Sequence, residues 1–121
     1  MAKILIIEDE KILSDLLERK LRETGYDVAV APNGEAGLSR MKKENFDLIL
    51  LDIIMPKKGG FEVLEEMQRN SQLKKIPVIV ISNSGQPVEI SRALELGVKD
   101  YLVKTQFDPQ EVIEKVKKQL G

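Results

Sequence analysis

Two short runs in this sequence, residues 4–7 and 48–51, are apolar at every position, and each run ends at an acidic residue. A strand that alternates apolar and polar side chains has one face in water. A strand without polar positions is typical of a parallel sheet that is covered on both faces. Segments with apolar residues at helical spacing follow both runs. We therefore predict an α/β fold in which helices pack on both faces of a parallel sheet.

The alternation of strand and helix continues from one end of the chain to the other. Gly25 stands where a left-handed helix C-cap is needed, Gly97 closes a later helix, and Asp108 followed by Pro109 is typical of a helix N-terminus. The predicted strands are residues 4–7, 27–31, 48–51, 78–81 and 100–103. The predicted helices are residues 11–24, 35–43, 61–70, 87–96 and 109–120.

Five strands that alternate with five helices, without a long linker or a low-complexity tract, predict a single domain over residues 1–121. The right-handed crossover rule leaves few topologies for a doubly wound parallel sheet, and the strand order 2-1-3-4-5 is a common one. Ligands of such sheets bind at the carboxyl ends of the first and third strands, where the winding reverses. Functional residues are therefore expected directly after those strands.

The chain has no cysteine and no histidine, which excludes disulfides, thiolate and imidazole metal ligands, and serine–histidine catalysis. With 19 basic and 20 acidic residues the formal net charge is -1, so direct binding to nucleic acid is not expected. The apolar runs are far shorter than the roughly 20 residues of a membrane span, and the first residues lead into a strand rather than a signal peptide. We expect a cytoplasmic protein that does not enter a membrane.

Polar residues directly follow four of the predicted strands, namely Glu8 with Asp9, Asp52, Ser82 and Lys104. Clustered carboxylates raise one another's pKa unless a cation holds them ionised. Oxygen ligands favour a hard cation, and an open site with few carboxylates suits Mg²⁺ better than Ca²⁺. Lys104 and Ser82, expected on the far side of Asp52 from the acid pair, would stabilise a transferring phosphoryl group, with Asp52 as the nucleophile.

Taken one at a time, these residues have simpler explanations. Glu8 and Asp9 alone are typical of helix N-caps, and Asp52 fits an Asx turn. Ser82 alone fits a strand-end hydroxyl, and Lys104 alone fits a surface lysine. Independent accidents would have to place all of them at one edge of one sheet, however, and clusters of titratable groups in such crevices are usually functional. We therefore interpret the set as one site.

A wider set of residues, by spacing and identity, resembles the receiver domain of two-component response regulators over essentially the whole chain. The set comprises Glu8, Asp9, Asp52, Met55, Pro56, Gly60, Ser82, Tyr101 and Lys104. The resemblance implies a flavodoxin-like fold and a signalling switch that phosphorylation activates. It also implies that a histidine kinase or a histidine phosphotransfer protein donates the phosphoryl group, which agrees with the absence of histidine from this chain.

The same resemblance assigns roles around the phosphoryl acceptor. It makes Asp52 the acceptor, and it makes Asp9, Asp52 and the backbone carbonyl of Ile54 the ligands of Mg²⁺. Glu8 stands where the family more often has aspartate, and it would assist the metal through water.

By the same resemblance Ser82 is the switch hydroxyl that moves to meet the phosphoryl group. Tyr101 is the aromatic residue that turns inward behind it, and Lys104 binds the phosphoryl oxygens. The first helix and nearby loops would meet the phosphoryl donor. The fourth helix, fifth strand and fifth helix would carry the signal to a downstream effector protein or output domain. The chain is compatible with a stand-alone receiver and with a part of a longer protein.

The sequence departs from the family pattern at several positions. Gly59 replaces the acid or amide that often precedes Gly60, which predicts a looser loop. Thr105 replaces the proline that often follows the lysine in a cis peptide. Because a cis bond before another residue type costs about 3 kcal/mol, we predict a trans bond and a loop over residues 105–108. By the same resemblance, the side chain of Ile54, two residues past Asp52, flanks the path of the hydrolytic water. Isoleucine offers no hydrogen bond to orient that water, which predicts slow self-dephosphorylation.

Three other functions fit this sequence less well. A magnesium-dependent phosphohydrolase of small substrates, resembling the haloacid dehalogenase group, needs a general acid two residues after its aspartate nucleophile, where this chain has Ile54. A flavin or nucleotide carrier needs a phosphate cradle rich in glycine or hydroxyl groups, where this chain has acids at residues 8–10. A docking module without activity has no use for Asp52, Ser82 and Lys104. We therefore expect a phosphoacceptor with weak self-phosphatase activity, not a dedicated enzyme.

Overall fold

The computed structural model describes residues 1–55, 57–105 and 108–121, and within them the elements alternate as predicted. The strands are β1 (Lys3–Ile7), β2 (Asp27–Ala31), β3 (Leu48–Asp52), β4 (Val78–Ser82) and β5 (Asp100–Val103). The helices are α1 (Lys11–Thr24), α2 (Gly34–Lys43), α3 (Gly60–Gln68), the short 3₁₀ helix η1 (Leu73–Lys75), α4 (Pro87–Glu95) and α5 (Pro109–Leu120). Pro56 and the interior of the predicted 105–108 loop lie outside the described residues.

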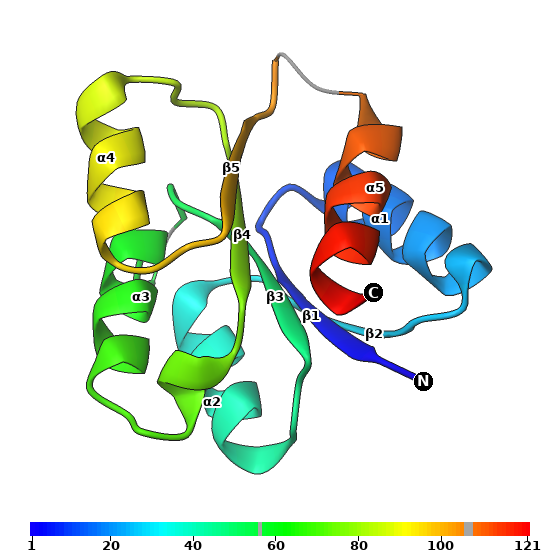
Figure 1. The fold of residues 1–121 in the computed structure, drawn as a ribbon, viewed down its shortest axis with the longest axis horizontal. Helices are drawn as coiled ribbons and strands as arrows, with labels where there is room; N and C mark the ends of the chain where they lie inside the picture. The colour runs from blue at the N-terminus through cyan, green and yellow to red at the C-terminus, as the bar shows by residue number, and fades with distance from the viewer. Residues whose placement is uncertain (56, 106–107) are drawn as a thin grey trace.

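The five strands form one parallel sheet in the order β2-β1-β3-β4-β5. Helices α1 and α5 lie on one face of this sheet, and α2, α3 and α4 lie on the other (Figure 1). The predicted doubly wound α/β fold with the order 2-1-3-4-5 is therefore confirmed. The winding reverses between β1 and β3, which places the expected ligand edge at their carboxyl ends.

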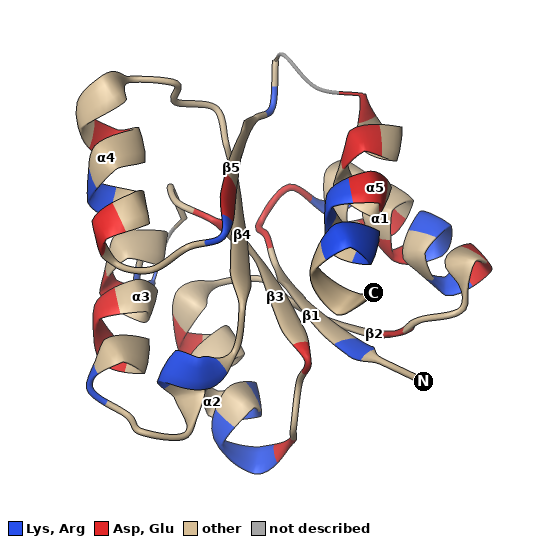
Figure 2. Cartoon of the chain, in the orientation of Figure 1, with Lys and Arg blue, Asp and Glu red and all other residues tan. Residues whose placement is uncertain are grey.

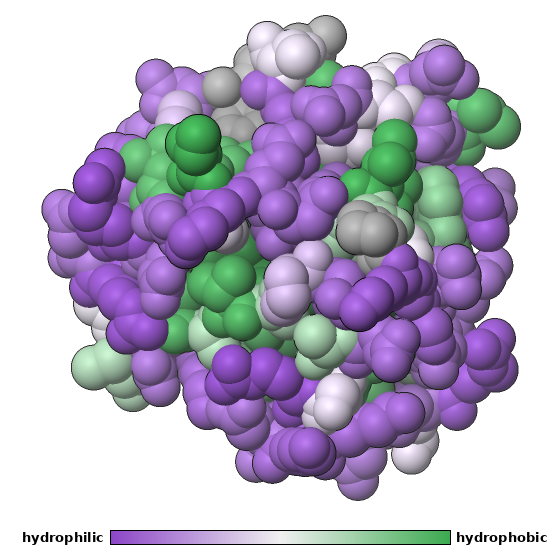
Figure 3. All heavy atoms as spheres, turned by 180° about the vertical axis from the view of Figure 1, so that it is seen from behind, coloured by the Kyte–Doolittle hydropathy of each residue, from purple (hydrophilic) through white to green (hydrophobic). Residues whose placement is uncertain are grey.

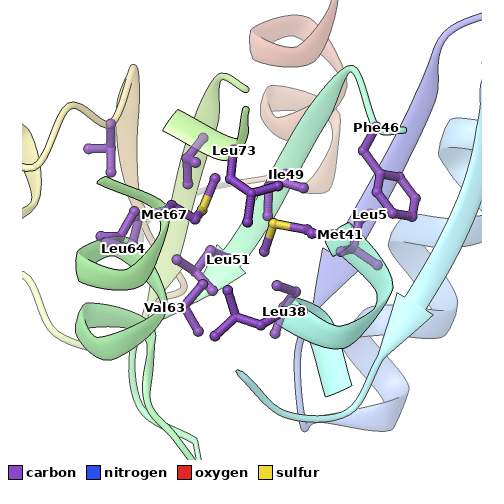
Figure 4. Close-up of a cluster of buried hydrophobic side chains, with 14 of the residues drawn as sticks. Leu5, Leu38, Met41, Phe46, Ile49, Leu51, Val63, Leu64, Met67 and Leu73 are labelled. Atoms are coloured by element: carbon purple, nitrogen blue, oxygen red, sulfur yellow. The ribbon is translucent and has the colours of Figure 1, made fainter. Parts of the chain in front are cut away.

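The sheet divides the core into two clusters, because successive side chains of a strand point to opposite faces. Leu5 and Ile7 of β1 join the cluster under α2 and α3, while Ile4 and Ile6 join the cluster under α1 and α5. Figure 4 shows the first cluster, in which side chains from α2 and α3 meet those from the sheet. Every residue of β3 is buried, so the strand that ends at Asp52 lies in the centre of the protein.

Local sequence signals account for several of the helix boundaries. Gly25 ends α1 in the left-handed conformation with φ 107°, as its position predicts. Asp108 caps α5 and forms a capping box with Glu111. The side chain of Asn33 accepts a hydrogen bond from the amide of Ala36, so α2 begins at Gly34, one residue earlier than expected.

Three strands are one residue longer than predicted, β1 at its start and β3 and β4 at their ends, and η1 has no counterpart in the prediction. Asp52 and Ser82 are the last residues of β3 and β4 instead of the first residues after them. The bond between Lys104 and Thr105 is trans, as predicted, since none of the described peptide bonds is cis. Seen from behind, the surface is mostly hydrophilic, with smaller groups of hydrophobic side chains between polar ones (Figure 3).

Candidate functional site

The ends of four strands bring the predicted site residues to one edge of the sheet. β1 and β3 pair in parallel up to the last residue of β1, so Glu8, which follows β1, lies beside Asp52 at the end of β3. Next to them, the amide of Lys104 donates a hydrogen bond of 2.7 Å to the carbonyl of Ser82, which joins the ends of β4 and β5. Figure 2 shows acidic residues in the loop that leads from β1 to α1.

Asp52 is a buried carboxylate, with 2% of its surface exposed. Its Oδ2 lies 3.3 Å from the ammonium of Lys104, and its Oδ1 accepts a hydrogen bond of 3.3 Å from the amide of Ile54. Burial and the neighbouring charge of Glu8 raise the pKa of Asp52 from 3.8 to about 7, although Lys104 opposes this increase. The positive charge of Lys104 therefore does not fully offset burial and the charge of Glu8, and ionised Asp52 is unfavourable near neutral pH.

Glu8 and Lys104 form the most buried ion pair of the site. Nζ of Lys104 lies 2.9 Å from Oε1 of Glu8, and the two side chains are 7% and 0% exposed. Burial by itself would lower the pKa of Lys104, but the carboxylates of Glu8 and Asp52 raise it above its usual value, so the amine stays charged. The prediction that Lys104 lies on the far side of Asp52 from the acids is wrong, because its long side chain reaches across to Glu8.

Glu8, Asp9 and Asp52 each offer a carboxylate oxygen, and these oxygens lie within 4.8 Å of one another. Oε1 of Glu8 is buried and accepts no well-aligned hydrogen bond, although Lys104 is close to it. Asp9 is exposed and lines a hollow of about 360 Å³ between α1 and the end of β2. An all-oxygen set with one open side and an oxygen in need of a partner fits a hard divalent cation such as Mg²⁺.

Ile54 lies two residues after the end of β3, and its side chain is at the surface, with 63% exposed. Its amide already donates to Asp52, as described above. The predicted metal contact is through its carbonyl, and this role stays a prediction.

Ser82 and Tyr101 lie together on the β4–β5 side of the site. Ser82 is fully buried, and its Oγ accepts a hydrogen bond of 3.2 Å from the amide of Ser84. The hydroxyl of Tyr101 donates a hydrogen bond to the carbonyl of Ser84 at 2.7 Å, and its ring packs against the core cluster under α2 and α3. Both side chains thus contact the segment that leads from β4 into α4.

The loop between β3 and α3 forms the other side of the site. Lys57 and Lys58 have positive φ angles of 49° and 80°, which are unfavourable for residues with a side chain. Gly60 has no room for a side chain, because a Cβ there would lie 2.5 Å from the carbonyl oxygen of Asp52. The family motif that this loop carries includes Pro56, which is outside the described residues.

Glu10 has no individual role among the residues predicted from the sequence, yet its carboxylate lies 3.3 Å from Nζ of Lys104. The only sequence signal was its place in the run of acids after β1. Glu89 was also missed. Its carboxylate accepts a hydrogen bond from the hydroxyl of Ser84 and so ties the β4–α4 segment to the first turn of α4.

Known proteins share both this sequence pattern and this fold. The model of the response regulator receiver domain matches residues 4–117. The PhoP alkaline phosphatase synthesis transcriptional regulatory protein of Bacillus subtilis is 36% identical over 115 residues, which cover 95% of this chain and 47% of PhoP.

Solved structures of response regulators have the same fold as this chain. The chemotaxis protein CheY4 of Vibrio cholerae has a TM-score of 0.89, with 28% identity and 98% of both chains covered. The response regulator TrrA of Thermotoga maritima, solved in complex with Mg(2+)-BeF, has a TM-score of 0.85 and 34% identity, with 98% of this chain and 99% of TrrA covered.

The chain spans about half the length of the curated relatives that it matches. None of the helices in the described part of the chain combines the length and the apolar character that a membrane crossing requires. The sheet order, the acids beside Asp52, and Lys104 at the end of β5 are accompanied by a family match over nearly the whole chain. The chain therefore belongs to the family of response regulator receiver domains.

Proposed function

We propose that Asp52 accepts a phosphoryl group from a phosphohistidine of a histidine kinase or of a histidine phosphotransfer protein. The observation that carries this proposal is the surroundings of Asp52. A buried carboxylate at the end of the central strand has an ammonium at 3.3 Å and two further carboxylates within 4.8 Å. The match to the receiver family supports the proposal, and so does the absence of histidine from this chain.

In the proposed reaction an oxygen of the Asp52 carboxylate attacks the phosphorus of the donor. The bond between phosphorus and the imidazole nitrogen breaks, its electron pair stays on the nitrogen, and the imidazole then takes a proton from solvent. The product on this chain is an aspartyl phosphate. Lys104 stabilises the negative charge on the phosphoryl oxygens, because its ammonium is held beside the attacking carboxylate.

Asp9, Asp52 and the carbonyl of Ile54, assisted by Glu8, would hold Mg²⁺. When bound, Mg²⁺ neutralises charge on the acids and on the transferring phosphoryl group. TrrA, the similar protein solved with Mg(2+)-BeF, supports the choice of metal. In the protein without metal, Lys104 offsets part of the acidic charge and keeps Glu8 in place.

We further propose that phosphorylation acts on a partner through Ser82 and Tyr101. Both residues contact the β4–α4 segment, so a movement of the Ser82 hydroxyl toward a phosphoryl oxygen would change the support of Ser84 and with it the position of Tyr101. Phosphorylation would favour an otherwise minor state of this segment. The recipient of the signal is an effector protein or an output domain.

The experiment uses the full chain with Mg²⁺ and acetyl phosphate, which donates its phosphoryl group and leaves acetate. Intact mass spectrometry should show one phosphoryl group on the wild-type protein and none on Asp52→Ala. Asp15→Asn is a matched control, because Asp15 is an exposed acid paired with Lys11 on the outside of α1. This variant should be phosphorylated as the wild type is.

Two outcomes would overturn the proposal. One is a wild-type protein that gains no phosphoryl group in the presence of Mg²⁺. The other is catalytic hydrolysis of a small phosphate ester without a covalent adduct, which would support the phosphohydrolase instead.

A further inference from the structure

Three carboxylates surround the ammonium of Lys104. Nζ lies 2.9 Å from Glu8 and 3.3 Å from each of Glu10 and Asp52. A lysine ammonium has three N–H donors and no acceptor. The contact with Asp52 is a hydrogen bond, and the contacts with Glu8 and Glu10 are ion pairs. Three carboxylates thus surround one ammonium with three donors, and an incoming phosphoryl oxygen can contact the ammonium fully only if one carboxylate leaves.

The three carboxylates differ in how easily they can leave. The side chains of Glu8 and Asp52 are 0% and 3% exposed, and Oε2 of Glu8 also accepts a hydrogen bond of 2.9 Å from the amide of Glu10. Moving either of these carboxylates away would leave a buried charge without a partner, which is unfavourable. The side chain of Glu10 is 50% exposed. It can rotate into water at low cost, as exposed ion-pair partners do.

We infer that Glu10 is a positioning residue whose carboxylate pairs with the ammonium of Lys104 until a phosphoryl oxygen replaces it. This inference rests on the proposed function and names a residue that regulates the same site. Glu10 thus holds Lys104 over the site before phosphorylation and competes with the phosphoryl group for it. Removing the carboxylate of Glu10 should therefore strengthen the binding of a phosphoryl group or of its mimic.

Substitution of Glu10 leaves the neighbouring structure in place. Glu10 is the N-cap residue of α1, but its side chain makes no capping hydrogen bond. Its amide, which supports Glu8, is unaffected by a change of side chain. Glu10→Gln removes the charge and keeps the length of the side chain, whereas Glu10→Asp keeps the charge and shortens the reach toward Lys104. A comparison of the two variants therefore distinguishes an effect of the direct contact between Glu10 and Lys104 from an effect of negative charge at a distance.

The test is a titration with beryllofluoride, a phosphoryl mimic, at saturating Mg²⁺ for each variant, followed by calorimetry. Both Glu10→Gln and Glu10→Asp should bind beryllofluoride about two- to fivefold more tightly than the wild type, the range that one exposed ion pair contributes. Asp15→Asn, which removes an acid of the same hollow that does not contact Lys104, should stay within about twofold of the wild type.

A spectroscopic readout separates this role from a structural one. With Mg²⁺ and without beryllofluoride, the NMR signals of the Lys104 side chain should shift in both Glu10 variants and not in Asp15→Asn. Unchanged beryllofluoride affinity in Glu10→Gln overturns the inference and leaves the proposed function intact. Tighter binding in Glu10→Gln with wild-type binding in Glu10→Asp also overturns it, since charge alone then explains the effect. A wild-type protein that binds no beryllofluoride with Mg²⁺ overturns the proposed function itself.

Discussion

The hydroxyl of Tyr101 donates a hydrogen bond of 2.7 Å to the backbone carbonyl of Ser84. This bond joins β5 to the segment between β4 and α4. The same segment is held by the bond from the amide of Ser84 to Ser82 and by the bond from the hydroxyl of Ser84 to Glu89. Since the residues around Ser84 are mostly exposed, these polar contacts provide much of the order of the segment.

Replacing Tyr101 with phenylalanine should loosen the β4–α4 segment. The change removes one hydrogen bond and keeps the ring that packs on the core, so we expect a loss of about 1 kcal/mol in the free energy of unfolding. Urea denaturation measures this loss, and hydrogen exchange at the amides near Ser84 should become faster. Tyr26→Phe is the control, because Tyr26 makes no side-chain hydrogen bond among the described residues. An equal loss in both variants would contradict the prediction.

Without metal, the stability of the protein should depend on pH through Asp52. Its pKa is raised from 3.8 to about 7, so between these values the folded state holds a proton that the unfolded state has released. Stability therefore falls as pH rises through this window. Asp52→Asn lacks this dependence and should be more stable than the wild type above pH 7 by about 1–3 kcal/mol, after allowance for screening by solvent.

Urea denaturation at pH 5 and pH 8 in the presence of a chelator measures the pH effect. The advantage of Asp52→Asn over the wild type should be small at pH 5 and large at pH 8. Mg²⁺ should reduce this advantage, because a bound cation stabilises ionised Asp52. An advantage that is the same at both pH values would show that the charge of Asp52 is already offset in the protein without metal.

Gly60→Ala should destabilise the protein, because the new methyl group meets backbone that cannot move easily. Its Cβ would lie 2.5 Å from the carbonyl oxygen of Asp52 and 2.7 Å from Cα of Ile53. We expect a loss of about 1–3 kcal/mol in thermal or urea denaturation. At Gly59 the nearest atom, the carbonyl oxygen of Ile53, would be 3.1 Å from a Cβ, so Gly59→Ala should cost clearly less. Equal losses would indicate that helix propensity, not the close approach, decides the effect.

Ile54→Asn should shorten the lifetime of the phosphorylated protein. The side chain at this position is exposed at the mouth of the site and as isoleucine offers no hydrogen bond to water. One added hydrogen bond of about 1 kcal/mol corresponds to roughly fivefold faster loss of phosphate. Mass spectrometry after removal of acetyl phosphate measures this loss, with Ile54→Leu as the control. An asparagine variant that loses phosphate no faster than the parent counts against the prediction.

The fold and the grouping of the acids could be predicted from the sequence because both depend on backbone position. Apolar runs without polar gaps indicate buried parallel strands, and residues that follow neighbouring strands of one sheet must lie close together. This reasoning placed Glu8 beside Asp52 correctly. Secondary structure with little apolar content, such as η1, left no pattern of this kind to recognise.

Side-chain reach could not be predicted in the same way. Lys104 follows β5, and two strands separate β5 from β1, but the four-carbon side chain of Lys104 extends across the edge of the sheet to Glu8 and Glu10. The place where a strand ends fixes the Cα atom and leaves the direction of a long side chain open. For the same reason the hydrogen bond from Tyr101 to Ser84 followed from the structure alone.

The burial of β3 along its full length has a mechanical consequence. β3 pairs with β1 on one side and with β4 on the other, and helices cover both faces of the sheet. A group attached to Asp52 is therefore bonded to the most rigidly held part of the molecule. Any shape change that starts there must be absorbed by the surrounding loops. Amide exchange in β3 should therefore stay slow with and without the attached group. Amide exchange in the loops at the edge of the sheet should differ between the two states.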